Sequence, residues 1–311
     1  MAAATSQHEV VCADGWRLAV TLVEPEGPAR AVAVVGHAMM VDRRTMDRGG
    51  GGLVSTLAAR GIAVVWPDLR GHGQSGPLAG EGGRWSYDDL VERDAPALYA
   101  FARARFPSLP LVAVGHSLFG HVSLAHLSRH PEAEVDALVL VAANLWLRAG
   151  EPSALVWQEK RLLLALMAFV SRRFGRFPAR RLRIGNTDES ADYVAQFADW
   201  VRQGDWSARD GFSYWEALAW IDRPVLALAG TGDRLMAHPA SMRAFVARVP
   251  RVRFRCAGRE RSQRRDVTAA ERLALDFDPG HMGLVTDARS RPVWEEIARF
   301  IRDEVPRRSR P

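Results

Sequence analysis

Three residues that are far apart in the chain carry side chains that could together attack a carbonyl carbon: Ser117, Asp233 and His281. A serine hydroxyl is a poor nucleophile near neutral pH, so it needs a base within hydrogen-bonding distance. An imidazole can act as that base when a carboxylate bonds its other nitrogen and holds it in one tautomer. These residue types therefore predict acyl transfer, provided that the fold brings them together.

Ser117 lies in the sequence GHSLFG, directly after an apolar run and directly before a helical pattern. A serine on a sharp strand-to-helix turn projects its hydroxyl from the edge of a sheet, and the helix start offers N–H groups to an oxyanion. A small residue is usual two positions after the serine, but this chain has Phe119 there and the glycine one later, at Gly120. The alternative interpretation is that Ser117 only caps a helix.

The candidate acid and base both lie beside glycines. Asp233 follows a predicted buried strand in the sequence GTGD, and His281 lies in the sequence GHMG just before the last predicted helix. Asp276 and Asp278 are alternative acids near the histidine, and Asp136 is a third alternative, although it precedes its strand rather than following it. We expect Asp233 to orient His281 and His281 to activate Ser117.

Short apolar runs that alternate with helical patterns must position these residues. After an N-terminal hairpin (residues 9–12 and 17–23), we expect strands at 31–35, 63–66, 111–114, 137–141, 225–229 and 252–256. Helices are expected at 52–60, 87–105, 118–130, 240–249 and 291–305. Continuous apolar runs alternating with helices predict an α/β fold with a doubly wound, mostly parallel sheet. Ligands bind such sheets at the carboxyl ends of the strands.

Residues 144–221 interrupt this alternation. The segment is helical in pattern, rich in Trp and Arg, and has no convincing strand. Its best helix, at 152–174, is apolar over much of its circumference, so we expect it to pack against another element. We interpret the segment as a helical cap inserted between two parts of one core, residues 1–143 and 222–311.

Four motifs resemble the α/β-hydrolase superfamily over nearly the whole chain: PDLRGHGQSG, GHSLFG, LALAGTGDRLM and DPGHMGL. The order Ser, Asp, His along the chain is that of this superfamily. The resemblance implies an eight-stranded sheet with Ser117 as nucleophile, Asp233 as acid and His281 as base. Within the cap, FGRFPARRLRIGN followed by ADW is similar to a group of predicted bacterial hydrolases of unassigned substrate.

The resemblance also implies two backbone N–H groups that would bind an oxyanion, those of Leu118 and of a residue in the sequence GHAMM. By position the second donor is Met39, but Ala38 stands where glycine is common, which leaves Met39 and Met40 both open. We expect Met40 and Phe119 to contribute apolar walls to a substrate pocket.

The composition excludes several other functions. Hydrophobic residues make up 48% of the 311 residues and charged residues 25%, as in ordinary soluble proteins. Cys12 and Cys256 are the only cysteines, too few for a disulfide framework or a thiolate metal site. His121, His126 and His130 recur along one predicted helix without an acidic partner motif, so we expect no metal and no cofactor.

The net charge is +6, and arginine carries almost all of the positive charge, with clusters at residues 172–183 and 259–265. These clusters lack a nucleic-acid-binding module, so we interpret them as solvated surface, with weak attraction to anions as the alternative. The chain begins without a secretory pattern, and its longest apolar run is too short to span a membrane. We therefore expect a cytoplasmic protein with a small-molecule partner.

The sequence favours hydrolysis of a carboxylic ester or thioester with an apolar moiety, through an acyl-enzyme. Thioesterase, lactonase, amidase and C–C hydrolase activities share the fold and remain open. Two further alternatives are a cofactor-free haloperoxidase or lyase, and a non-catalytic small-molecule-binding protein. The unusual Phe119 favours the non-catalytic alternative.

Overall fold

The computed structural model of the chain describes residues 3–263 and 267–305. Its main sheet has the strand order β1-β2-β4-β3-β5-β6-β9-β10-β11. The strands are β1 (Ala4–Val11), β2 (Arg17–Glu24), β3 (Ala31–Gly36), β4 (Ile62–Pro67), β5 (Leu111–His116), β6 (Ala137–Val141), β9 (Val225–Gly230), β10 (Val252–Gly258) and β11 (Arg272–Ala274). Only β1 with β2 and β2 with β4 pair antiparallel among these described strands, so the predicted mostly parallel sheet is confirmed.

The number of strands differs from the expectation. The described residues form nine strands in the main sheet rather than eight. The additional strand is β11, whose three residues pair parallel with the end of β10. A strand this short carries too few side chains to produce a periodic pattern in the sequence.

The predicted hairpin forms, with β1 starting earlier than expected. Val11 and Arg17 close the antiparallel ladder, and Gly15 in the turn has φ +82°. Such a φ is the left-handed region in which glycine meets no steric penalty. The hairpin extends the sheet beyond β4.

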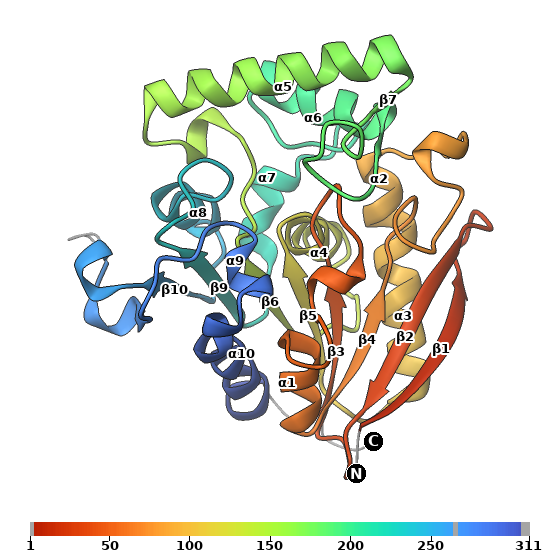
Figure 1. Ribbon diagram of the computed structural model, residues 1–311, viewed down its shortest axis with the longest axis vertical. Helices are drawn as coiled ribbons and strands as arrows, with labels where there is room; N and C mark the ends of the chain where they lie inside the picture. The colour runs from red at the N-terminus through yellow and green to blue at the C-terminus, as the bar shows by residue number, and fades with distance from the viewer. Residues whose placement is uncertain (1–2, 264–266, 306–311) are drawn as a thin grey trace.

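Helices cover both faces of the sheet (Figure 1). They are α1 (Leu53–Ala59), α2 (Tyr87–Asp89), α3 (Ala95–Arg105), α4 (Leu118–Arg129), α8 (Pro239–Val246), α9 (Gly283–Thr286) and α10 (Arg291–Asp303). Strand β3 shows the two-sided burial: Ala31, Ala33 and Val35 pack with α1 and α10, whereas Val32 and Val34 pack with α3 and α4. This is why the strands read as continuous apolar runs. The helix expected at 87–105 is divided by a π-helical turn at Leu90–Asp94.

Residues 142–224 lie between β6 and β9, and we call them the β6–β9 insertion. It contains α5 (Ala154–Phe174), α6 (Ala191–Gln203) and α7 (Tyr214–Ala217). Figure 1 shows α5 and α6 above one end of the main sheet. The expectation of no strand in this segment is wrong, because β7 (Arg176–Phe177) pairs antiparallel with β8 (Glu189–Ser190). Two-residue strands again leave no pattern in the sequence.

Helix α5 is packed on one side only. It packs against α6, with Trp157, Leu164 and Met167 among its buried residues. Five of its large apolar residues are instead exposed to solvent, with exposed fractions between 52% and 74%: Leu155, Leu162, Leu166, Phe169 and Phe174. The predicted packing of this helix is therefore found on one side, and these five apolar residues are each more than half exposed.

In the described part of the chain, no helix combines the length and apolar character needed to cross a membrane. Two of the arginines expected in surface clusters, Arg264 and Arg265, lie outside the described residues.

Candidate active site

Ser117 is the single residue between strand β5 and helix α4. Its backbone has φ 50° and ψ −105°, a conformation that non-glycine residues rarely adopt and that costs free energy. Ser117 is partly exposed, whereas His116 and Leu118 on either side are buried. The turn therefore presents the Ser117 hydroxyl at the carboxyl end of a central strand.

Two glycines allow the start of α4 to lie directly against the sheet. A Cβ atom added to Gly115 would lie 2.1 Å from the backbone nitrogen of Gly120. A Cβ atom on Gly120 would lie 2.6 Å from the Cβ of Ala143, which follows β6. No side chain fits in either place, so both positions require glycine.

Phe119, the residue that departs from the usual motif, has its own compensating glycine. A Cβ atom on Gly36, at the end of β3, would lie 2.1 Å from Cγ of Phe119. The Phe119 side chain is fully buried (0% exposed), and its ring centroid lies 6.4 Å from that of Tyr99. The structure therefore places Phe119 in the core beneath the turn and does not bring it to a substrate-binding surface.

The candidate acid and base are hydrogen-bonded to each other. His281 Nδ1 donates to Oδ2 of Asp233 over 2.8 Å. The N–H groups of Met236 and Ala237 donate to Oδ1 and Oδ2 of the same carboxylate, each over 3.0 Å. Burial alone would raise the pKa of Asp233, but His281 and the two N–H groups outweigh burial and lower that pKa. Asp233 is therefore ionised near neutral pH, and Nε2 of His281 is left to accept a proton.

The acid loop and the histidine loop lie against each other because glycines leave room. A Cβ on Gly230 would lie 2.3 Å from the carbonyl oxygen of Pro279, and one on Gly232 would lie 2.5 Å from that of Asp278. The N–H of Gly232 also donates to the carbonyl oxygen of Pro279 over 3.0 Å. The glycines of GTGD thus explain how residues separated by 48 positions come into contact.

The three alternative acids lie elsewhere. Asp278 accepts hydrogen bonds from the hydroxyls of Thr231 and Ser262, over 2.6 and 2.8 Å. Asp276 is exposed. Asp136 accepts the N–H of Leu111, at the amino end of β5, over 2.8 Å. Asp233 is therefore the acid that the structure brings to His281.

His116, the residue before Ser117, connects the turn to the histidine loop. Its Nε2 donates to the carbonyl oxygen of His281 over 3.0 Å, and the two imidazole centroids are 5.0 Å apart. Burial, together with the nearby His281, lowers the pKa of His116 to about 3, so this imidazole is neutral. The backbone of His281 is thus bonded to the residue that directly precedes Ser117.

The loop after β3 carries the candidate oxyanion donors. Nδ1 of His37 donates to the carbonyl oxygen of Ala38 over 2.7 Å, and because a trans peptide is planar, the N–H of Met39 points the opposite way. The N–H of Met40 donates to Oε1 of Glu189 over 2.5 Å. Among the described residues, the N–H groups of Met39 and Leu118 have no hydrogen-bond acceptor. Of the two donors that the sequence left open, Met40 is therefore already engaged.

Comparison with known proteins agrees with this geometry. Residues 27–257 match the model of the family described as serine aminopeptidase, S33. The chain belongs to this family of α/β hydrolases. The resemblance seen in the sequence motifs is therefore confirmed at the level of the superfamily.

One curated relative of the hydrolase is a lipase by name. The monoacylglycerol lipase of Mycolicibacterium smegmatis is 30% identical over 137 residues, which is 43% of this chain and 45% of that protein. The match thus spans less than half the length of this curated relative.

Among solved structures, a thermostable carboxyl esterase from Bacillus coagulans has a TM-score of 0.63 at 16% identity and is covered over 100% of its chain and 98% of this one. The Pyrococcus furiosus esterase Pf2001 has a TM-score of 0.62 at 13% identity, over 98% of this chain and 92% of that one. These structural similarities show a shared fold.

The other histidines of the hydrolase have separate partners. His121 bonds the hydroxyl of Tyr87, His126 the carbonyl oxygen of Val91, and His130 the carboxylate of Glu92. These three side chains therefore point to different neighbours rather than to a common ligand. His72 bonds Glu189, a residue that the sequence did not single out. No motif marks Glu189, since its contacts come from segments more than 100 residues away.

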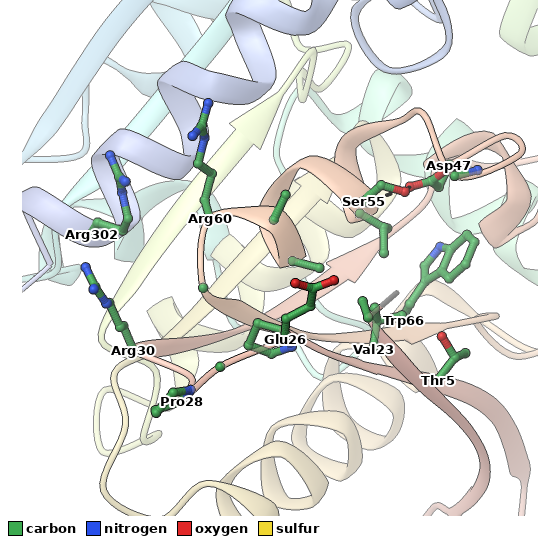
Figure 2. A pocket seen from close by; sticks show the side chains of 18 of the residues that line it. Thr5, Val23, Glu26, Pro28, Arg30, Asp47, Ser55, Arg60, Trp66 and Arg302 are labelled. Carbon is green, nitrogen blue, oxygen red and sulfur yellow. Dashed lines mark hydrogen bonds between the residues drawn. The ribbon is translucent and has the colours of Figure 1, made fainter. Parts of the chain in front are cut away.

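A groove of about 940 Å³ lies elsewhere on the hydrolase, between the N-terminal hairpin and α1 (Figure 2). Glu26, Arg30, Arg60 and Trp66 are among its lining residues. None of the candidate site residues lines it, and neither does any described histidine. Its serine, Ser55, instead bonds Asp47, so this groove holds no serine–histidine pair.

Replacing Asp233 by Asn should lower kcat on the order of 10⁴-fold, because the imidazole of His281 would lose the partner that fixes its tautomer. The matched control is Asp276→Asn, which removes an exposed carboxylate five residues before the histidine and should leave kcat unchanged. Steady-state ester hydrolysis measures both variants. Equal activity of Asp233→Asn and the wild type would assign the orienting role to another acid.

Because Phe119 packs directly on Gly36, substitutions at these two positions should have non-additive effects on the free energy of unfolding. We expect Gly36→Ala to destabilise the fold by about 1–3 kcal/mol or more through overpacking, and Phe119→Ala by about 3–5 kcal/mol. The double variant should be more stable than the sum of the two effects predicts, because alanine at position 119 lacks the Cγ and Cδ1 atoms that would lie 2.1 and 2.3 Å from the new methyl group. The contact with Cβ of residue 119, at 2.6 Å, would remain. Urea unfolding measures the cycle, with Gly150→Ala, which has space for a Cβ, as control. Additive effects would contradict the packing explanation.

Proposed function

We propose that this hydrolase cleaves carboxylic esters or thioesters with an apolar moiety, with Ser117, His281 and Asp233 as its catalytic residues. The observation that carries the proposal is the 2.8 Å bond between Asp233 and Nδ1 of His281 beside a strained serine turn. The bond leaves Nε2 as the acceptor, which is the nitrogen that a general base uses in this arrangement.

The reaction follows from these roles. Oγ of Ser117 attacks the substrate carbonyl carbon as its proton passes to Nε2 of His281. The N–H groups of Met39 and Leu118 would bind the resulting oxyanion, and each such donor typically contributes about 2.7–4 kcal/mol of transition-state stabilisation. His281 then protonates the leaving alcohol or thiol, and water activated by the same imidazole hydrolyses the acyl-enzyme.

The β6–β9 insertion supports a preference for apolar substrates. Tyr193 of the insertion bonds Sδ of Met39, and Trp146 donates to the carbonyl oxygen of Met236, three residues after Asp233. The rings of Trp146 and Phe197 pack 5.7 Å apart. We propose that the insertion, over residues 144–221, acts as an apolar cap over the site, with Met40 beside it.

Ester substrates are also those named for the relatives, which include a monoacylglycerol lipase and several esterases. The non-catalytic alternative rested on the unusual Phe119, and Gly36 leaves the space that the side chain of this residue occupies in the core. We propose the cytoplasm as the location of the enzyme.

A fluorophosphonate should label the wild-type protein at Ser117 and should not label Ser117→Ala, which removes the nucleophile. Mass spectrometry of the labelled peptide identifies the residue. Hydrolysis of p-nitrophenyl esters of rising chain length should fall on the order of 10⁶-fold in Ser117→Ala, and His281→Ala should lose comparable activity. His130→Ala, which changes a partly exposed histidine paired with Glu92, is the control and should remain active. Folded wild-type protein that is neither labelled nor active would refute the proposal.

A further inference from the structure

We propose that Glu189 and Gly185 of the β6–β9 insertion are positioning residues for the oxyanion-binding loop, so that the insertion is a structural part of the catalytic centre. This inference rests on the proposed function, because it concerns how the N–H of Met39 is aimed. It predicts that residues about 150 positions from this loop control kcat.

The insertion holds Met40 from both sides of its backbone. The N–H of Met40 donates to Oε1 of Glu189 over 2.5 Å. Its carbonyl oxygen accepts the N–H groups of Asn186 and Thr187, over 2.9 and 3.1 Å. Met40 has φ 61°, a left-handed conformation that a non-glycine residue keeps only when its surroundings impose it. Three hydrogen bonds from one segment supply that restraint.

Gly185 allows this approach. A Cβ atom added there would lie 2.3 Å from the carbonyl oxygen of Met40 and 2.7 Å from its Cβ. Asn186 adds a side-chain bond, since its Nδ2 donates to Oδ2 of Asp42 over 2.9 Å. The segment from Gly185 to Glu189 therefore follows the oxyanion-binding loop closely enough to exclude even a methyl group.

Glu189 is itself fixed to the core. Its side chain is fully buried (0% exposed), and Oε1 lies 3.0 Å from Nε2 of His72, which is equally buried. Nδ1 of His72 donates to the carbonyl oxygen of Arg70 over 2.8 Å. Burial alone would lower the pKa of His72, but the Glu189 carboxylate outweighs burial and raises that pKa. A buried carboxylate held in this way cannot turn toward solvent. It therefore fixes the position of the N–H group whose hydrogen bond it accepts.

These contacts determine the direction of the N–H of Met39. His37 fixes the peptide before Met39 through the carbonyl of Ala38, and Glu189 fixes the peptide after it through the N–H of Met40. With both neighbouring peptide planes held, the backbone angles of Met39 have little freedom. An oxyanion donor contributes fully only at the position where the charge develops, and a displacement of about 1 Å can cost on the order of 10²-fold in rate.

The first experiment compares Glu189→Ala with Glu189→Gln in the full-length enzyme on a p-nitrophenyl ester. Alanine removes the acceptor for the N–H of Met40, so kcat should fall on the order of 10²-fold with KM nearly unchanged, because the oxyanion forms only in the transition state. Glutamine keeps a carbonyl oxygen at the place of Oε1, the atom that both the N–H of Met40 and Nε2 of His72 contact, so it should restore most of kcat. The control is Asp188→Asn, since Asp188 bonds Arg176 and the N–H of Arg180, both within the insertion, and no other residue in the described part of the chain.

The second variant, Gly185→Ala, disturbs Met40 at its carbonyl group, which belongs to the next peptide along the chain, and leaves every ionisable group in place. The added methyl group must displace the carbonyl of Met40, so kcat should fall while KM remains close to that of the wild type. Thermal unfolding, expected at a lower temperature because of the overpacking, shows whether the variant is folded. This variant keeps the proposal testable if Glu189→Ala does not fold.

The outcomes separate this inference from the proposed function. A fall in kcat in Glu189→Ala or Gly185→Ala, with KM unchanged and with rescue by glutamine at position 189, supports it. An active wild type whose kcat is unaffected in both variants overturns this inference alone. Equal losses in Glu189→Ala and Asp188→Asn, or a rise in KM without a fall in kcat, assign the insertion a general structural or binding role and also overturn it. A wild type that neither hydrolyses esters nor reacts with a fluorophosphonate overturns both.

Discussion

The structure around the site depends on one backbone constraint, the positive-φ turn at Ser117. The chain leaves a fully buried parallel strand and enters a helix with no loop between them. That is possible only because glycines at 115 and 120 let the two backbones touch. The same turn aims the hydroxyl of Ser117 out of the sheet, exposes the N–H of Leu118 at a helix start, and directs Phe119 into the core. The strain is offset by the packing on both sides.

The parallel sheet places the remaining groups at the same edge. Ser117 and Asp233 both follow strands of the sheet, and His281 precedes α9 on a loop that glycines bring against the acid loop. Hydrogen bonds join these segments, which are far apart in the sequence. His116 bonds the backbone carbonyl of His281, and Asp233 bonds its ring. The insertion contributes from the other side through Glu189. The site is thus assembled from segments whose relative positions are set mostly by backbone contacts.

Much of this arrangement could be predicted from the sequence, because buried parallel strands read as apolar runs. The strand predicted at 111–114 is β5, and the helix predicted at 118–130 is α4, each within two residues. Strands of two or three residues, such as β7, β8 and β11, were missed because periodicity needs longer segments. The role of Glu189 was missed for another reason: it follows from a contact with Met40 across 149 positions, and no local pattern records such a contact. Phe119 was expected in the pocket, but its direction depends on the space left by Gly36.

The most direct test of the account is a crystal structure of the enzyme phosphonylated by a fluorophosphonate. We predict phosphorus bonded to Oγ of Ser117, with the phosphoryl oxygen about 2.7–3.1 Å from the N–H groups of both Met39 and Leu118. The N–H of Met40 should remain on Glu189, and the ring of His281 on Asp233. A phosphoryl oxygen bound by Met40 instead, or an adduct on a residue other than Ser117, would contradict it.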